Sequence, residues 1–362
     1  MMSARMVLAI DLGKSRCRAV VEDPRRRVVH DGVGAPGLAA SGGVDAALAA
    51  LRPALASLRA SSGPGPTGSE DGAAPVDAVA VDAVAVGAVG VGAVAVGAAG
   101  AWAAPAAASE LARRLATEAD VPAVVMSDVV SAHAGALDGG EGVLLIAGTG
   151  AAALGMNRDG ATLIDGWGPE LGDFGSGSWL GREALRAVLR ASARLGPATS
   201  LTDAVRPSVG DVSAVQAWLA QGGALARHLA TLAPTLLDAA AAGDEVAARI
   251  AEEAVRLLAA SATAAASATA AASATAAASA SASAAASAST SASASRPPTG
   301  SASAVALHGG LTDHDWFRGR LVASLREGGL TVVPSAGDAL DGARLLAERS
   351  DLPHERFVHR AE

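Results

Sequence analysis

The residues best suited to chemistry in this chain lie in two glycine-rich turns, each with a hydroxyl or a carboxylate. Gly148-Thr149-Gly150 follows the apolar run 143–147, and Gly-Asp-Phe-Gly-Ser-Gly at 172–177 precedes a helical run. Two residues of the first turn lack a Cβ, so its backbone can approach a ligand closely. Either turn alone is equally consistent with an ordinary tight turn. Together they indicate a phosphate cradle with a metal-facing acid beside it.

A third turn follows the first predicted strand of the chain. Residues 6–10 are apolar, Asp11-Leu12-Gly13-Lys14-Ser15 turns, and residues 16–21 run back. An Asp at the end of a strand, followed by Gly and Ser, can hold a metal-bound phosphate through its carboxylate, backbone amides and a hydroxyl. A plain hairpin with a polar tip is the alternative.

Size and composition limit the classes of function. A chain of 362 residues is long enough for two domains of ordinary size. Its net charge of −8 and its single lysine, Lys14, argue against a nucleic-acid or anionic-membrane surface. One cysteine, Cys17, excludes an internal disulfide framework. The apolar run 7–10 is too short for a signal peptide, so we expect a soluble cytoplasmic protein.

Two stretches of low complexity interrupt the pattern. Five pentads of the form DAVAV span 77–101, and an odd repeat turns the valines of a strand to the opposite face with each copy. We therefore expect only the last copies, 93–96, to form a core strand. A membrane span over 83–109 is the rival interpretation, but its flanks are acidic. The Ala/Ser-rich stretch 260–304 lacks large apolar side chains, which predicts a flexible surface insert that builds no core.

The elements that must position these turns follow from apolar spacing. Strands are expected at 6–10, 16–21, within 23–30 after a turn, and at 93–96, 122–126, 143–147, 151–156, 305–308 and 330–333. Helices are expected at 44–60, 110–119, 129–137, 179–192, within 212–258, at 316–327 and at 338–350.

Taken in order, the signals are strand-DLGKS, strand-GAAG, strand-SD-helix, strand-GTG, GDFGSG-helix and strand-HGG. This order resembles the actin-like sugar kinase and ATPase superfamily, and more narrowly the N-acetylglucosamine or glucosamine kinase branch of the BadF/BadG/BcrA/BcrD-type ATPases. The resemblance implies an α/β fold of two actin-like (RNase H-like) domains, hinged around a nucleotide cleft. We place the domains at 1–125 and 126–362.

The resemblance also implies a set of site residues for ATP, Mg²⁺ and a small-molecule sugar. The first phosphate loop would be Asp11, Gly13, Lys14 and Ser15, and the second Gly148, Thr149 and Gly150. Gly309 and Gly310 would lie against the adenosine, where a side chain could not fit. Asp11 and Asp173 would face the metal, and Trp167, Gly168, Asp173 and Asp128 would face the sugar.

Asp128 is the predicted catalytic base, because a kinase needs a carboxylate to accept the proton of the sugar hydroxyl. It follows a strand and precedes a helix, where related sugar kinases carry Asn-Asp, with Ser127 in place of the Asn. A helix N-cap is the alternative role, since Asp at a helix start is favoured locally.

The sequence departs from the family on the sugar side. Gly37 lies in a loop where Asn is common, Ala101 stands where an acid is usual, and Phe174 replaces the acid of Gly-Asp-Glu-Gly-Ser. The leading hypothesis is an ATP-dependent kinase that phosphorylates the hydroxymethyl group of an amino sugar. The alternatives are an ATPase that activates 2-hydroxyacyl-CoA dehydratases and a non-catalytic nucleotide or sugar sensor. The sequence is compatible with a homodimer.

Overall fold

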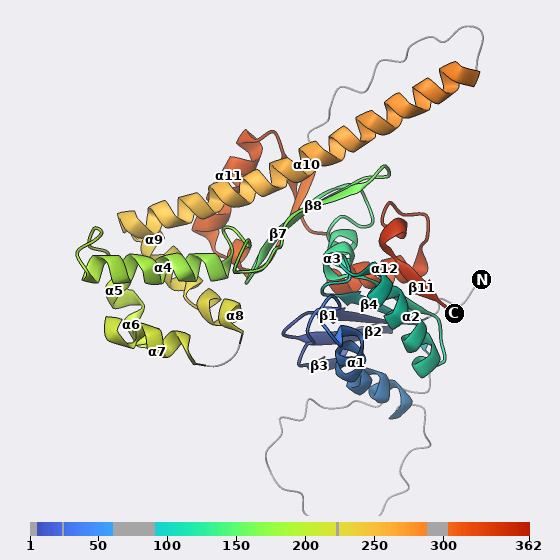
Figure 1. Ribbon diagram of the computed structural model, residues 1–362, viewed down its shortest axis with the longest axis horizontal. Helices are drawn as coiled ribbons and strands as arrows, with labels where there is room; N and C mark the ends of the chain where they lie inside the picture. The colour runs from blue at the N-terminus through green and yellow to red at the C-terminus, as the bar shows by residue number, and fades with distance from the viewer. Residues whose placement is uncertain (1–5, 24, 61–90, 222–223, 288–302) are drawn as a thin grey trace, which may run out of the picture. The chain divides into compact units, whose positions relative to one another are not determined.

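The computed structural model describes residues 6–23, 25–60, 91–221, 224–287 and 303–362 (Figure 1). It divides the chain into two compact units. The first comprises Met1–Ser131, Ala339–Ser350 and Phe357–Glu362, and the second Ala132–Asp338 and Asp351–Arg356. This division differs from the predicted domains 1–125 and 126–362 at two places: the boundary falls after residue 131, and the last helix and strand belong to the first unit.

A six-stranded sheet forms the centre of the first unit, in the order β11-β5-β4-β1-β2-β3. The strands β1, β2 and β3 form an antiparallel meander, and β4 and β5 continue the sheet parallel to β1. The short strand β11, which the sequence pattern did not predict, pairs antiparallel with β5. The strands are β1 Met6–Leu12, β2 Cys17–Asp23, β3 Arg25–Gly32, β4 Val91–Ala98, β5 Ala123–Ser127 and β11 His359–Ala361.

Helices cover this sheet because its central strands are apolar on both faces. Leu8 and Ile10 of β1 share a core with Leu51 and Leu111, while α12 contacts β1 and β4. Burial on both faces is typical of the parallel part of a sheet. The helices are α1 Gly43–Ala60, α2 Pro105–Ala119, α3 Asp128–Ala136, which crosses the boundary between the units, and α12 Ala339–Glu348.

The second unit repeats the plan of the first, with a five-stranded sheet in the order β10-β9-β6-β7-β8. Again three strands form an antiparallel meander, and two later strands extend the sheet parallel to its first strand. The strands are β6 Gly142–Ala147, β7 Ala151–Met156, β8 Ala161–Asp165, β9 Ala304–His308 and β10 Thr331–Val333. The polar turn Asn157–Gly160 joins β7 to β8, as predicted.

Helices make up the rest of the second unit, and the last of them, Glu355–Phe357, ends in the first unit. Those that the structure describes are α4 Gly177–Ser192, α5 Leu201–Ala204, α6 Arg206–Val209, η1 Val212–Ala214, α7 Val215–Leu219, α8 Leu225–Ala230, α9 Ala233–Ala241, α10 Glu245–Ser287, η2 Gly310–Asp313, α11 Asp315–Glu327 and η3 Glu355–Phe357.

The Ala/Ser-rich stretch is a correction to the sequence prediction. Up to Ser287 it belongs to the 43-residue helix α10, which contacts β6, β7, β8, α9 and α11 (Figure 1). Ala262, Ala265 and Thr269 are buried, and a Cβ at Gly155 of β7 would lie 2.3 Å from Thr269 Oγ1. Small side chains let the helix approach the sheet closely, so a repeat without large apolar residues still buries one face. Residues 288–302 lie outside the described residues.

By length and composition alone, the span 245–276 of α10 would suffice to cross a membrane. The buried face that it packs on the sheet of the second unit is the feature of a core helix. The membrane span weighed for 83–109 finds no support in the described part of that stretch: residues 91–98 form β4, between β1 and β5. The pentad copies at 77–90 lie outside the described residues.

Candidate active site

The first predicted phosphate loop is a tight turn between β1 and β2. The Gly13 amide donates to the Arg16 carbonyl at 2.9 Å, which closes the turn. Gly34 passes directly over it: a Cβ there would lie 2.1 Å from Gly13 O and 2.7 Å from the Ser15 amide nitrogen. Lys14 at the tip is exposed. The turn is thus held by backbone contacts, and its lysine projects from it.

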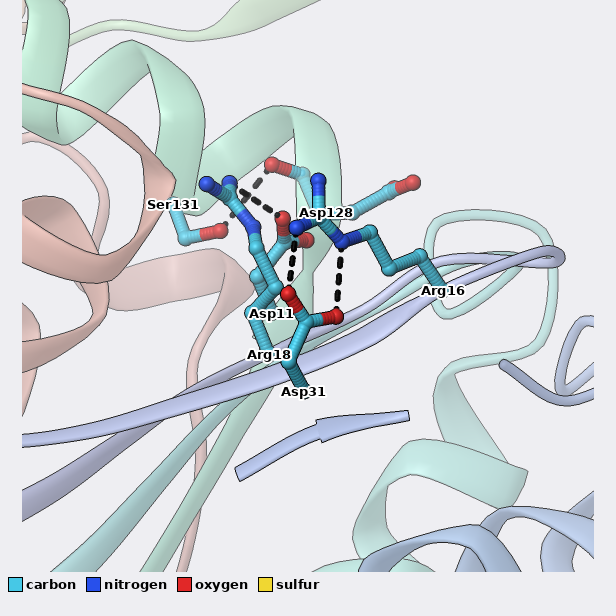
Figure 2. Close-up of polar contacts among 6 residues, drawn as sticks. All are labelled: Asp11, Arg16, Arg18, Asp31, Asp128 and Ser131. Atoms are coloured by element: carbon cyan, nitrogen blue, oxygen red, sulfur yellow. Dashed lines mark hydrogen bonds and ion pairs between the residues drawn. The ribbon is translucent and has the colours of Figure 1, made fainter. Parts of the chain in front are cut away.

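Two arginines beside this turn each form an ion pair with a different aspartate (Figure 2). Arg18 lies opposite Asp11 in the hairpin, and its Nη2 donates to Asp11 Oδ2 at 3.0 Å. Arg16 forms a two-armed pair with Asp31, whose Oδ1 accepts from Nε at 2.8 Å. Neither arginine was predicted from the sequence, although the register of the hairpin places Arg18 across from Asp11.

Asp128 stands at the start of α3, directly after β5. Its Oδ1 accepts from the Ser127 hydroxyl at 3.0 Å and from the Val129 amide at 2.9 Å. Desolvation raises the pKa of Asp128, and the negative charge of Asp11 adds to this, whereas the two hydrogen bonds and Lys14 oppose it. Within the described chain, no hydrogen bond reaches Oδ2.

The two roles weighed for Asp128 can be compared with this geometry. An N-cap side chain normally accepts from the second or third amide of the helix. Here the accepting oxygen takes the amide of the next residue, Val129, and the Ser131 hydroxyl donates to the Asp128 carbonyl at 2.9 Å (Figure 2). The carboxyl group therefore helps to fix the helix start but does not make the usual cap, which leaves the role of base as a prediction.

The second predicted phosphate loop joins β6 to β7 in the second unit. The Gly148 amide donates to the Gly150 carbonyl at 3.0 Å. The first amides of α4 hold the loop from behind: Gly177 N donates to Gly148 O at 2.7 Å, and Ser178 N to Thr149 O at 3.1 Å. Two backbone amides at the N-terminus of α4 are therefore hydrogen-bonded to the loop itself.

Gly309, which was predicted to lie against the adenosine, packs against this loop. Its φ is +109°, and a Cβ there would lie 2.6 Å from Ala147 O and 2.8 Å from the Gly148 amide nitrogen. At Gly310 the nearest atom to an added Cβ is 3.9 Å away, on Asp313. Glycine at 309 is thus required by the fold, whereas at 310 the protein itself leaves room for a side chain.

Asp173 is buried beside the second loop. It has a φ of +54°, and a Cβ on Gly150 would lie 2.9 Å from its Oδ2. A second aspartate, which was not predicted from the sequence, braces the backbone of this turn. Asp165, at the end of β8, accepts from the amides of Asp173 and Phe174, both at 2.8 Å.

The loop between Asp165 and α4 presents an aromatic pair. Trp167 is 66% exposed and Phe174 38% exposed, and their rings meet edge to face with centroids 6.4 Å apart. Gly168 has a φ of +91°, and its carbonyl accepts from the Gly172 amide at 2.8 Å. Phe174 therefore pairs with Trp167 at the surface of this loop.

Two departures from the expected pattern have packing roles in the first unit. Ala101 is 3% exposed, and the neighbouring Trp102 stacks on Phe357 with centroids 5.1 Å apart. At Gly37, a Cβ would lie 3.2 Å from Ala99 O. The loop carrying Ala101 and Trp102 is thus used to hold the C-terminal segment.

The structure groups the predicted residues by unit. Asp11, Gly13, Lys14, Ser15 and Asp128 lie in the first unit, and Gly148, Thr149, Gly150, Trp167, Gly168, Asp173, Gly309 and Gly310 in the second. In the described ranges, no cluster of three or more His, Cys, Asp or Glu could hold a metal by itself. Mg²⁺ in nucleotide sites uses one or two carboxylates with water and phosphate oxygens, so it does not need such a cluster.

Each unit combines an antiparallel meander, two further parallel strands and a glycine turn after its first strand, which defines the actin-like fold class. The family model described as "BadF/BadG/BcrA/BcrD ATPase family" matches residues 8–288. The chain belongs to this family.

Relatives and a solved structure agree with this placement. An N-acetyl-D-glucosamine kinase of Dictyostelium discoideum is 53% identical over 62 residues, 17% of this chain and 19% of that protein. An N-acetylmuramic acid/N-acetylglucosamine kinase of Clostridium acetobutylicum is 31% identical over 144 residues, 39% of this chain and 47% of that protein. The chain thus matches about a fifth and about half of the lengths of these two relatives.

The fold itself is found in a crystal structure from Chromobacterium violaceum, provisionally named an N-acetylglucosamine kinase. The two chains are 24% identical with a TM-score of 0.58, and the match covers 94% of this chain and 98% of the other. This likeness supports the actin-like fold for both units.

Proposed function

We propose that this chain is an ATP-dependent kinase that phosphorylates the hydroxymethyl group of an amino sugar, N-acetylglucosamine or glucosamine. The observation that carries the proposal is Asp128. Its carboxyl group stands at a helix start in the same unit as the Asp11 hairpin, and its pKa is raised by desolvation. A carboxylate with a raised pKa is a better acceptor for a hydroxyl proton than an ordinary one.

The remaining residues take roles in positioning. Lys14 and Ser15 of the first unit and Gly148–Gly150 of the second would hold the phosphates, with Gly309 and Gly310 against the adenosine. Phosphoryl transfer depends mainly on such positioning and on neutralisation of charge. Mg²⁺ bound with the nucleotide would neutralise phosphate charge, and Asp11 and Asp173 would hold it.

On the acceptor side, we assign Trp167, Gly168 and Asp173 to the sugar. The exposed edge-to-face pair of Trp167 with Phe174 offers an apolar surface of the kind that C–H faces of a pyranose can contact. The names of the two relatives, both N-acetylglucosamine kinases, support an amino sugar as the acceptor.

A coupled ADP-release assay with Mg-ATP and a panel of hexoses and hexosamines tests the proposal. We expect turnover stimulated by amino sugars and lost in Asp128→Asn, with Asp159→Asn, an exposed turn residue, as the matched control. Turnover that does not depend on sugar indicates an ATPase instead. Nucleotide binding without turnover on any sugar contradicts both enzymes and favours a nucleotide or sugar sensor.

The activator of a 2-hydroxyacyl-CoA dehydratase is the weaker alternative. In such an activator, two subunits hold one iron–sulfur cluster between them, and a cluster needs several thiolate ligands. Cys17 is the chain's one cysteine, and burial raises the pKa of its thiol to about 11. A thiol of this kind stays protonated at neutral pH, which disfavours a cluster ligand.

A further inference from the structure

Asp165 is a buried carboxylate that the proposed chemistry leaves without a role. It ends β8, is 3% exposed, and has a φ of +63°. Among the residues that the structure describes, no cation pairs with it. A buried, unpaired charge is costly unless hydrogen bonds compensate it.

Two backbone amides supply that compensation. Asp173 N donates to Asp165 Oδ1 at 2.8 Å, and Phe174 N donates to Oδ2 at 2.8 Å. Gly172 lies close to the same carboxylate, since a Cβ there would be 2.3 Å from Oδ1. Both oxygens of Asp165 are therefore committed to the backbone of one turn.

That turn connects directly to the second glycine loop. The Asp173 carbonyl accepts from the Ser176 amide at 3.1 Å, and the amides of Gly177 and Ser178 donate to the loop carbonyls. The Asp173 side chain also lies against this loop, at Gly150. The conformation of Asp173 is left-handed, which is uncommon for an L-residue although Asp tolerates it better than most.

We propose that Asp165 is the positioning residue for Asp173. Its carboxylate fixes the backbone of the 172–177 turn and so aims the Asp173 side chain at the Gly148–Gly150 loop. This inference rests on the proposed function, in which Asp173 faces the metal of the bound nucleotide. Outer residues that orient a metal-facing group affect metal affinity about 10–100-fold when they are replaced.

Asp165→Asn is the sharpest single change. The amide is nearly isosteric, but it keeps one acceptor oxygen and turns an N–H₂ group toward a backbone N–H. The Mg²⁺ concentration for half-maximal ADP binding, measured by calorimetry with Mg²⁺ and ADP as probes, should rise about tenfold or more. ADP binding without Mg²⁺ should be unchanged, and Asp159→Asn should behave as the wild type.

A double-mutant cycle separates positioning from a general packing role. If Asp165 acts through Asp173, then Asp165→Asn combined with Asp173→Asn should need no more Mg²⁺ than Asp173→Asn alone, because coupled residues are not additive. A lower unfolding midpoint with an unchanged Mg²⁺ requirement overturns the inference. Should Asp165→Asn not fold, Gly172→Ala tests the same contact, because it keeps the carboxylate and pushes on it.

The same measurements separate this inference from the proposed kinase activity. A wild-type protein that phosphorylates no sugar, but whose Mg-ADP binding depends on Asp165, contradicts the kinase and supports the positioning role. A wild-type protein that phosphorylates a sugar, but whose Mg²⁺ requirement is unchanged by Asp165→Asn, supports the kinase and contradicts the positioning role.

Discussion

The two glycine turns that follow the first strand of each unit have different side chains around them. Around the Gly13 turn lie charged side chains: Arg18 pairs with Asp11, Arg16 with Asp31, and Lys14 is exposed. The Gly148–Gly150 turn is instead held by backbone amides of α4 and by the close packing of Gly309. Backbone contacts close both turns, but the first also carries ion pairs between side chains, which water and salt screen.

The largest expected effect is on catalysis, and it comes from Asp128 in the same unit as the Gly13 turn. Asp128→Asn removes the proton acceptor but keeps the shape of the side chain, so kcat should fall about 10²–10⁴-fold while ADP binding is retained. Because desolvation raises the pKa of Asp128, the acid limb of kcat/KM should lie above the usual aspartate pKa. Steady-state kinetics across pH check both points, and a variant with wild-type kcat would exclude Asp128 as the base.

The next effect contrasts the two turns directly. Gly309→Ala places a Cβ 2.6 Å from Ala147 O at a φ of +109°, which should cost about 1–3 kcal/mol of stability. In Gly13→Ala the nearest atom, Arg16 O, is 3.4 Å away, so the loss should stay within about 0.5 kcal/mol. Urea unfolding of both variants measures the difference, and equal losses would remove the steric distinction between the turns.

Acid should weaken the second unit through a buried histidine pair. His133 Nε2 lies 3.1 Å from Gly142 O and so donates to it, which makes His133 Nδ1 the acceptor for His354 Nε2 at 2.9 Å. Burial lowers the pKa of His133 to about 4 and that of His354 to about 3. Both histidines are thus neutral in the folded protein, although each would charge near pH 6.5 when unfolded.

Because the folded pKa values are depressed, the stability that these histidines contribute is fully present above about pH 6.5 and is lost as the pH falls toward 4. The loss should reach up to about 1.4 kcal/mol per pH unit for each proton taken up by the unfolded chain. Urea unfolding at stepped pH measures it. His354→Leu should flatten the dependence, and an unchanged slope in that variant would assign the acid loss to other groups.

The smallest effects should come from the arginines of the first turn. Arg18→Ala removes a partly buried pair with Asp11 and should cost no more than about 1 kcal/mol. Arg16→Ala, at an exposed pair, should leave the unfolding midpoint unchanged. A salt titration sharpens the comparison, because the Arg18 effect should shrink in high salt while the Gly309→Ala effect should not. A large, salt-independent loss in Arg18→Ala would contradict it.

Much of the fold could be predicted from apolar periodicity. The predicted strands at 143–147 and 151–156 correspond to β6 and β7, and the helix at 129–137 to α3. Such elements bury whole faces, which leaves a repeating pattern in the sequence. The strand β11 was missed because three residues that complete a sheet edge carry no period of their own.

The site was predicted unevenly for a related reason. Glycines and acids at strand ends can be recognised by residue type, so Gly13, Gly148 and Asp128 could be named as candidates from the sequence. Arg18 and Asp165 act through partners seven and eight or more positions away, and their roles depend on register and on a turn closing back. The same limit produced the error over α10, where burial depends on Gly155 of a distant strand making room for the helix.

That contact has a consequence for how the chain tolerates changes in repeat number. Burial on α10 ends near Thr269 and Ser273, while Ala274, Thr275 and Ala276 are exposed. Duplication of one SATAAA unit at 274–276 would lengthen the helix by about 9 Å at a point where its side chains are exposed. The same duplication before Ala262 would rotate the buried stripe by about a third of a turn off the sheet. Slippage of the coding repeat is therefore nearly neutral at one end of a single helix and disruptive at the other.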